Sequence, residues 1–259
     1  MKKETITDYK LLLDTAVLAG QIMLQNGAEI YRVEDTIQRI LELSEFQTTE
    51  AYVTGTGMFA TLADPLYDSL TVVKRIRNRS TDLNKIYQVN DISRKLCEGH
   101  LTLKQAYYEL KHLPVPSYAR LLRYLSVPFI AAAFALMLGG GHPMDALGAG
   151  IDGVFLLLCM MLGEKLGFNS YLSIFADSMV IALGSLLLTK TLGLPMNMDS
   201  IIIGTIMPIV PGAALTTAVR DTLQGDYISG MSKAVEAVLL AFAIAIGTGL
   251  GITLGGMIL

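Results

Sequence analysis

Two aspartates lie inside long apolar segments, where a charge needs a specific reason to be present. Asp152 lies about a third of the way along the segment 146–163, and Asp177 lies near the middle of the segment 171–190. A charge at bilayer depth costs at least about 2.5–3.5 kcal/mol on insertion scales, so such residues usually face a cavity or a partner. Both are therefore candidate translocation residues. Solvation near the membrane interface is the alternative for Asp152.

The next candidate is a break within the apolar segment 200–219. Pro208 and Pro211 fall near its middle, and each removes a backbone N–H and clashes with a carbonyl four residues earlier. Transporters use the backbone groups of such broken helices to hold solute. Gly212 lets a backbone or a solute approach closely, and Thr216 adds a hydroxyl one turn on. The alternative is a proline kink that serves packing alone.

Charged residues follow this break. Arg220 and Asp221 end the fourth apolar segment, Asp226 lies in the connector, and Glu236 begins the fifth segment. We interpret them as gate residues, with Arg220 able to attract a solute carboxylate. For Glu236, solvation at the interface is an equally good interpretation.

A third group of charges lies near the N-terminus. Glu29, Arg32 and Glu34 belong to a predicted helix at 28–44, and Glu29 and Arg32 share a helix face because they are three residues apart. Local pairing on a solvated face is the simpler interpretation. The alternative is that Glu29, Arg32 and Glu34 couple the domains, with Arg32 and Glu34 binding charged groups on the membrane loops, including Arg220 and Asp221.

The distribution of charge divides the chain. Of 20 Lys and Arg, 16 lie in residues 1–123, as do 15 of 23 Asp and Glu, whereas the rest of the chain is nearly free of charge. This pattern predicts a polar domain at 1–117 followed by a transmembrane domain at 118–259.

The N-terminal half has mixed periodicity. Apolar residues at helical spacing predict helices at about 8–26, 28–44, 82–98 and 102–113, the last with a capping box at Thr102 and Gln105. Between them, "TTEAYVTG", "GMFATLAD" and "SLTVVKRIR" predict a small antiparallel sheet. The half is therefore predicted to be an α+β domain, and "LPVPS" at 113–117 a linker.

The second half predicts an α-helical membrane protein of about five transmembrane helices. The apolar segments span about 121–140, 146–163, 171–190, 200–219 and 234–257, each near the length that crosses a bilayer. Lys and Arg bias puts the N-terminal domain in the cytoplasm and the C-terminus outside. Gly247, Gly251 and Gly255 lie on one face, which we interpret first as a helix–helix contact and second as part of a substrate path.

Several function classes are disfavoured. The start of the chain fits an amphipathic helix better than a cleavable signal peptide. Cys97 and Cys159 lie one in each half, and the three histidines lack ligand spacing. We therefore expect no disulfide framework, no metal, no cofactor, no nucleic-acid partner and no enzymatic activity.

Two stretches resemble the signatures of the threonine/serine exporter family. They are "NGAEIYRVEDTIQRI" at 26–40 and "MPIVPGAALTTAVRDTLQGDYISG" at 207–230, the latter continued by "EAVLLAFAIAIG". The resemblance covers nearly the whole chain. It places the first signature on Gly27, Glu29, Arg32 and Glu34, and the second on Pro208, Pro211, Gly212, Thr216, Arg220, Asp221, Gly225 and Asp226.

The resemblance implies a bacterial inner-membrane exporter of small polar metabolites, driven by the proton gradient. The solute is threonine or serine in one branch and a dicarboxylate such as succinate in another. Long members carry a second membrane segment that this chain lacks, so the short form resembles the large subunit of a two-component exporter. A small membrane partner subunit is implied, and a homo-oligomer stays open.

Two other classes remain as alternatives. An intramembrane aspartyl hydrolase would pair Asp152 with Asp177, although "GAGID" does not have the spacing of a Gly-x-Gly-Asp motif. A membrane-tethered regulatory module would use the soluble domain to bind a ligand without transporting it.

Overall fold

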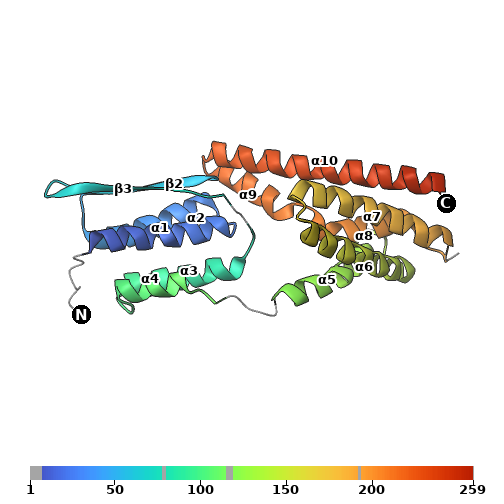
Figure 1. Ribbon diagram of the computed structural model, residues 1–259, viewed down its shortest axis with the longest axis horizontal. Helices are drawn as coiled ribbons and strands as arrows, with labels where there is room; N and C mark the ends of the chain where they lie inside the picture. Colours follow the sequence, from blue (N-terminus) through green and yellow to red (C-terminus); the bar gives the residue numbers. More distant parts are fainter. Residues whose placement is uncertain (1–7, 78–79, 115–118, 192–193, 259) are drawn as a thin grey trace. The chain divides into compact units, whose positions relative to one another are not determined.

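The computed structural model describes residues 8–77, 80–114, 119–191 and 194–258, and the chain divides into two compact units (Figure 1). The first unit contains Met1–Val115 together with Leu215–Ala234, and the second contains Pro116–Ala214 and Val235–Leu259. Most of the predicted linker at 113–117 lies outside the described residues. Residues 215–234, which form the end of one helix and the start of the next, thus pack with the N-terminal residues.

Two amphipathic helices form the centre of the first unit. They are α1 (Tyr9–Gln25) and α2 (Ile30–Leu41), and a 3-10 turn, η1 (Glu42–Ser44), follows α2. The turn between the helices contains Gly27 at φ +88°, a backbone conformation that glycine adopts without strain. The predicted apolar stripes are buried, as the full burial of Leu12 and Ile37 illustrates.

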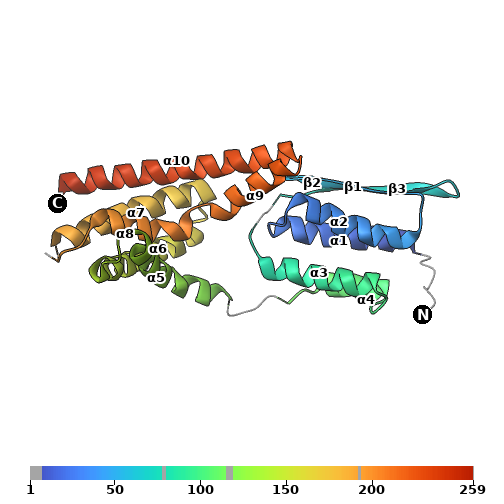
Figure 2. The ribbon, with the colours of Figure 1, turned by 180° about the vertical axis from the view of Figure 1, so that it is seen from behind.

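A three-stranded antiparallel sheet covers one side of these helices, as Figures 1 and 2 show. Its strands are β1 (Thr48–Thr54), β2 (Gly57–Asp64) and β3 (Tyr67–Arg75), in the order β1-β2-β3. Along β2, Met58 and Ala60 are buried whereas Phe59 is 46% exposed, so one face of the sheet packs on the helices. The predicted sheet is confirmed.

Two further helices lie on the other side of α1 and α2 (Figure 2). They are α3 (Leu83–Cys97) and α4 (Leu103–Lys111), and the predicted capping box between Thr102 and Gln105 is present. The first unit is therefore a three-layer α+β structure around one apolar core.

The second unit is helical. Its elements are α5 (Ala119–Leu138), α6 (Pro143–Leu166), α7 (Ser170–Thr191), α8 (Met198–Ile206), the 3-10 turn η2 (Met207–Ile209), the start of α9 (Gly212–Leu223) and most of α10 (Tyr227–Ile258). Among the described residues, α6, α7 and α10 are each long and apolar enough to cross a membrane, and the bent pair of α8 and α9 makes up to four. The described apolar part of α5, Tyr124–Leu138, is shorter. Five spans therefore stay a prediction.

Glycines allow the membrane helices to approach closely. A Cβ on Gly153 of α6 would lie 2.8 Å from the Pro128 Cα of α5. On α10, a Cβ on Gly247 would lie 2.4 Å from a carbonyl oxygen of α7, and a Cβ on Gly251 would lie 2.6 Å from another. A Cβ on Gly255 would lie 2.5 Å from the Leu186 side chain, which is also on α7. The predicted glycine face of α10 is thus a contact with α7.

Candidate translocation and coupling site

The fourth apolar segment is broken at its two prolines. Helix α8 gives way to the turn at Met207–Ile209, Val210 is extended, and α9 begins at Gly212. The two helices differ in direction by 60°. Gly212 is exposed, and a Cβ at this position would have no heavy atom within 4 Å. The break therefore leaves open space beside the start of α9.

Asp152 is held between α6 and α7 with no exposure. One oxygen, Oδ2, accepts a hydrogen bond of 2.7 Å from the Ser185 hydroxyl. The other, Oδ1, has no hydrogen-bond partner among the described residues, and a Cβ on Gly184 would lie 2.1 Å from it. Glycine at position 184 therefore leaves room for the Asp152 carboxyl. Because Asp152 is fully buried, the alternative that it is solvated at the membrane interface does not fit.

Asp177 lies on α7 and is 3% exposed. Its carboxyl faces the Cys159 thiol of α6. Ile181, one turn further along α7, packs in an apolar cluster with Ile209 of the proline turn. Asp177 is therefore buried, one helical turn from an apolar cluster that includes a residue of the proline turn.

The two aspartates lie at different levels along α7. Asp152 binds Ser185, which is eight residues from Asp177 and hence about 12 Å away along the helix axis. Aspartyl hydrolases need two carboxyls close enough to share one proton. The geometry therefore gives the hydrolase alternative no support.

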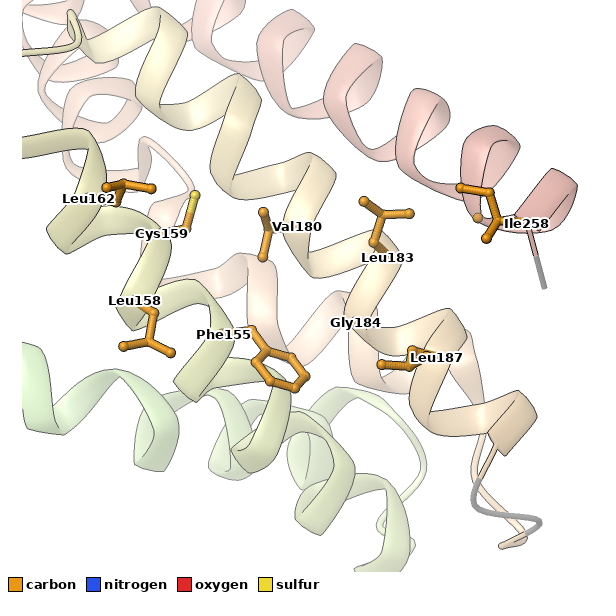
Figure 3. Close-up of a pocket in the computed structure, with 10 residues that line it drawn as sticks. Phe155, Leu158, Cys159, Leu162, Val180, Leu183, Gly184, Leu187 and Ile258 are labelled. Carbon is orange, nitrogen blue, oxygen red and sulfur yellow. The ribbon is translucent and has the colours of Figure 1, made fainter. Parts of the chain in front are cut away.

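A groove of about 540 Å³ lies between α6, α7 and the end of α10 (Figure 3). Its lining is aliphatic or aromatic apart from the thiol of Cys159 and two glycines, and Figure 3 shows Phe155, Leu183 and Ile258 around it. No charged side chain lines it. The groove suits an apolar chain and not a polar solute.

A second set of charges lies within the first unit. Its residues Leu215–Ala234, which we term the hairpin, contain the end of α9, a turn at Gly225 with φ +94°, and the start of α10. The two arms pack closely, since a Cβ on Gly230 would lie 2.9 Å from the Ala218 carbonyl oxygen. Close packing of the two helical arms therefore holds the side chains of the hairpin in place.

Glu29 at the start of α2 forms an ion pair with Arg220 of the hairpin. The Glu29 side chain is 12% exposed, and Arg32 contacts its other oxygen at 3.3 Å. Burial of Glu29 would raise the pKa of this carboxyl. The hydrogen bonds from its own backbone and from Arg220, with the charge of Arg32, outweigh burial, so the pKa lies below its usual value.

Asp221, the neighbour of Arg220, is fully buried and makes two contacts. Its Oδ1 accepts the backbone N–H of Ile30 at 3.5 Å, and its Oδ2 pairs with the Lys233 ammonium at 2.6 Å. The first contact supplies a carboxylate to the N-terminus of α2, whose own N-cap, Glu29, makes no side-chain cap hydrogen bond. We term the Glu29–Arg220 and Ile30–Asp221 contacts together the coupling contact.

Three more polar groups surround it. The Ser229 hydroxyl accepts the Gly55 N–H at 3.2 Å, and the Glu34 carboxylate accepts the Val53 N–H at 2.8 Å. Burial raises the pKa of Glu34, the Val53 hydrogen bond opposes the rise, and the charge of Asp226 adds to it. Burial also raises the pKa of Asp226, with Asp221 adding and Lys233 opposing.

The family model described as "Putative threonine/serine exporter" matches residues 14–255. The chain belongs to the threonine/serine exporter family. A "Probable threonine/serine exporter" of Mycobacterium tuberculosis is 22% identical over an alignment of 243 residues, and the alignment covers 91% of this chain and 45% of that relative. The chain thus spans about half the length of this curated relative. No solved structure matches.

In this exporter-family chain, the two signature stretches are in contact. Glu29 and Ile30 of the first bind Arg220 and Asp221 of the second, although 191 residues separate the members of each pair. The prediction had assigned this contact to Arg32 and Glu34. The structure differs because Arg32 reaches back one turn to Glu29, and Glu34 is engaged by strand β1.

The remaining predicted site residues are more scattered. Pro208 and Pro211 are partly buried, whereas Thr216 on α9 and Glu236 on α10 are exposed. The sequence interpretation missed Lys233, Ser185 and Ser229. Lys233 could have been found from the sequence, because its charge is opposite to that of Asp221 and both residues lie in the same short connector. No sequence pattern pointed to either serine. No cluster of three or more His, Cys, Asp or Glu suited to a metal occurs in the described part of the chain.

Proposed function

We propose that this chain is a subunit of a secondary transporter that exports small polar metabolites through the bacterial inner membrane. The solutes are threonine and serine, or a dicarboxylate such as succinate. The observation that carries the proposal is the continuity of α9. This single helix begins at the proline break and ends at the coupling contact, so a change at either end can reach the other.

The proline break supplies the solute site in this proposal. Transporters hold solute at broken membrane helices of this kind, and α9 begins at Gly212 directly after the break. Asp177 and Asp152 carry a proton or contact a solute ammonium. Their burial in a membrane unit supports this, because an ionisable group there is a functional candidate by default.

The hairpin supports a cytoplasmic N-terminal domain. Because residues 215–234 pack with the N-terminal residues, the connector before α10 lies on the same side of the membrane as that domain. Most Lys and Arg of the chain are on this side, and the positive-inside rule then assigns it to the cytoplasm. Helix α10 carries the C-terminus to the outside, and Arg220, Asp221, Asp226 and Glu236 lie near the cytoplasmic gate.

A small membrane subunit of the same family completes the transporter in this proposal. The support is the resemblance of the two signature stretches to the exporter family, which implies such a partner. The lipid bilayer and the solute are the other partners, and the subunit can also assemble with itself.

Efflux from proteoliposomes tests the proposal. Vesicles loaded with labelled threonine, serine or succinate would contain this chain alone, or this chain with the membrane protein encoded beside it. We expect efflux of one solute class, accelerated by an imposed proton gradient, with both chains present. Absence of efflux of all three solutes from correctly folded, co-reconstituted chains would contradict transport. Efflux without the second chain would contradict the need for a partner.

A further inference from the structure

A small polar pocket lies between α2 and α3 in the first unit. Its volume is about 100 Å³. That is room for about three waters at about 30 Å³ each, or for one carboxylate or phosphate group. The pocket is therefore too small for a nucleotide and suited to a small ligand or to the charged end of one.

Three guanidinium groups line this pocket. They belong to Arg32 and Arg39 of α2 and to Arg94 of α3, and the one carboxylate in the lining is that of Asp35. Arg39 pairs with Asp35 at 2.6 Å, and Arg32 with Glu29 at 3.3 Å. Within the described ranges, Arg94 forms no ion pair. The lining therefore has a net charge of +2, and the charge of Arg94 is the one that neither Asp35 nor Glu29 neutralises.

Two hydroxyl side chains also line the pocket. Thr36 is 5% exposed and Ser93 is 4% exposed, and Asn90 lines the pocket with them. Among the described residues neither hydroxyl has a hydrogen-bond partner, and neither oxygen is fully enclosed, so both are open to water in the pocket. A ligand that replaces this water can accept hydrogen bonds from both. The two hydroxyls face the same space as the unneutralised arginine.

We propose that this pocket is a binding site for a small oxyanion, the carboxylate or phosphate group of a metabolite. Guanidinium groups bind both through paired charge-assisted hydrogen bonds, and Arg94 supplies the charge. The hydroxyls of Thr36 and Ser93 donate to the remaining oxygens. This site is separate from solute translocation and gives the cytoplasmic domain a ligand of its own. Because Arg32 also contacts Glu29, the bound anion lies next to the coupling contact.

Equilibrium dialysis of the full chain in detergent tests the site. The probes are labelled inorganic phosphate and labelled succinate, at constant ionic strength in sodium chloride. We expect saturable binding of at least one probe, weakened about tenfold or more in Arg94→Gln and in Ser93→Ala, since each removes a hydrogen bond to the anion. Phosphate and succinate competing for one site would show that the pocket recognises the oxyanion group; binding of one alone would identify the ligand class.

Lys104→Gln is the matched control, because it removes one exposed positive charge from the same domain outside the pocket. It should bind both probes as the unmodified chain does. Circular dichroism spectra establish that each variant is folded. Binding that is equal in Arg94→Gln, Ser93→Ala and the unmodified chain would place the anion elsewhere and overturn the proposal. Absence of binding of both probes at millimolar concentration would also overturn it.

Discussion

The Asp221 carboxylate and the Lys233 ammonium form an ion pair of 2.6 Å whose side chains are 0% and 12% exposed. The pair joins the end of α9 to the start of α10, and the other oxygen of Asp221 receives the N-terminus of α2. One buried carboxylate thus connects both arms of the hairpin to the N-terminal signature. Exposed ion pairs contribute little to stability, whereas breaking a buried pair leaves a charge without compensation.

Lys233→Met should weaken the attachment of the hairpin, because it leaves the Asp221 charge buried and unpaired. We expect a loss of about 3–5 kcal/mol in the stability of the first unit. Hydrogen exchange followed by mass spectrometry should show faster exchange in residues 215–234 and at the start of α2. The double variant Lys233→Met/Asp221→Asn should recover part of the loss, since no buried charge remains. An unchanged exchange pattern in the single variant would contradict a structural role for the pair.

Glu29→Gln and Arg220→Gln should each reduce export, and the double variant should be no worse than either single variant. The reason is that both remove the same ion pair, and effects of residues in direct contact are not additive. Efflux from proteoliposomes measures this. Lys95→Gln is the control, because it breaks an exposed pair with Asp91 on α3 and should leave export unchanged. Additive losses would mean that the two residues act separately.

Glu34→Gln should change how stability depends on pH. The pKa of Glu34 is raised in the folded chain above its ordinary value of 4.5, so the folded state binds this proton more tightly than the unfolded state. Its stabilising contribution is full below pH 4.5 and is lost as pH rises through the folded pKa. The amide still accepts the Val53 N–H and carries no charge beside Asp226.

The thermal midpoint of Glu34→Gln should therefore match that of the unmodified chain at low pH and exceed it at neutral pH. Glu29→Gln should do the reverse, because the lowered pKa of Glu29 gives stability above pH 4.5 that is lost as pH falls through the folded value. Melting curves followed by circular dichroism measure both differences. A Glu34→Gln midpoint below that of the unmodified chain at neutral pH would contradict a net cost of the Glu34 charge from burial and from Asp226.

The sequence predicted the elements well because local physics determines them. The stripes of α1 and α2, the alternation in β2 and the capping box at Thr102 depend on residues within a few positions. The confirmed architecture is a helical membrane protein with a small antiparallel sheet near its N-terminus. The sequence did not predict that residues 215–234 pack with the first unit, because this packing depends on contacts between residues far apart in the chain.

The site was predicted at the level of segments and less well at the level of side chains. The sequence pointed to Glu29, Arg32 and Glu34 as coupling residues and assigned the contact with Arg220 and Asp221 to Arg32 and Glu34. Glu29 pairs with Arg220 instead, because the face of α2 that meets the hairpin depends on tertiary packing. No nearby sequence pattern predicted that the Asp152 Oδ1 would lie beside Gly184 without a hydrogen-bond partner.

Asp177→Asn should lower export by about tenfold or more and flatten its dependence on pH. The amide keeps the size of the side chain at this buried position but cannot carry a proton. A proton-coupled step that uses the carboxyl is then lost, whereas a packing role would survive. Efflux at several pH values separates these outcomes. Rates and pH dependence equal to those of the unmodified chain would remove Asp177 from proton coupling.

Gly251→Ala should destabilise the contact between α10 and α7. A Cβ at Gly251 would lie 2.6 Å from the Met179 carbonyl oxygen and 2.7 Å from the Ala182 Cβ, so the helices must separate. Overpacking of this kind costs about 1–3 kcal/mol. Gly249→Ala is the matched control on the same helix, because its Cβ would have no heavy atom within 4 Å. It should be neutral or slightly stabilising, since alanine favours the helix more than glycine does. Thermal unfolding of the full chain in detergent compares the two, and equal midpoints would mean that the glycine face of α10 does not depend on close packing against α7.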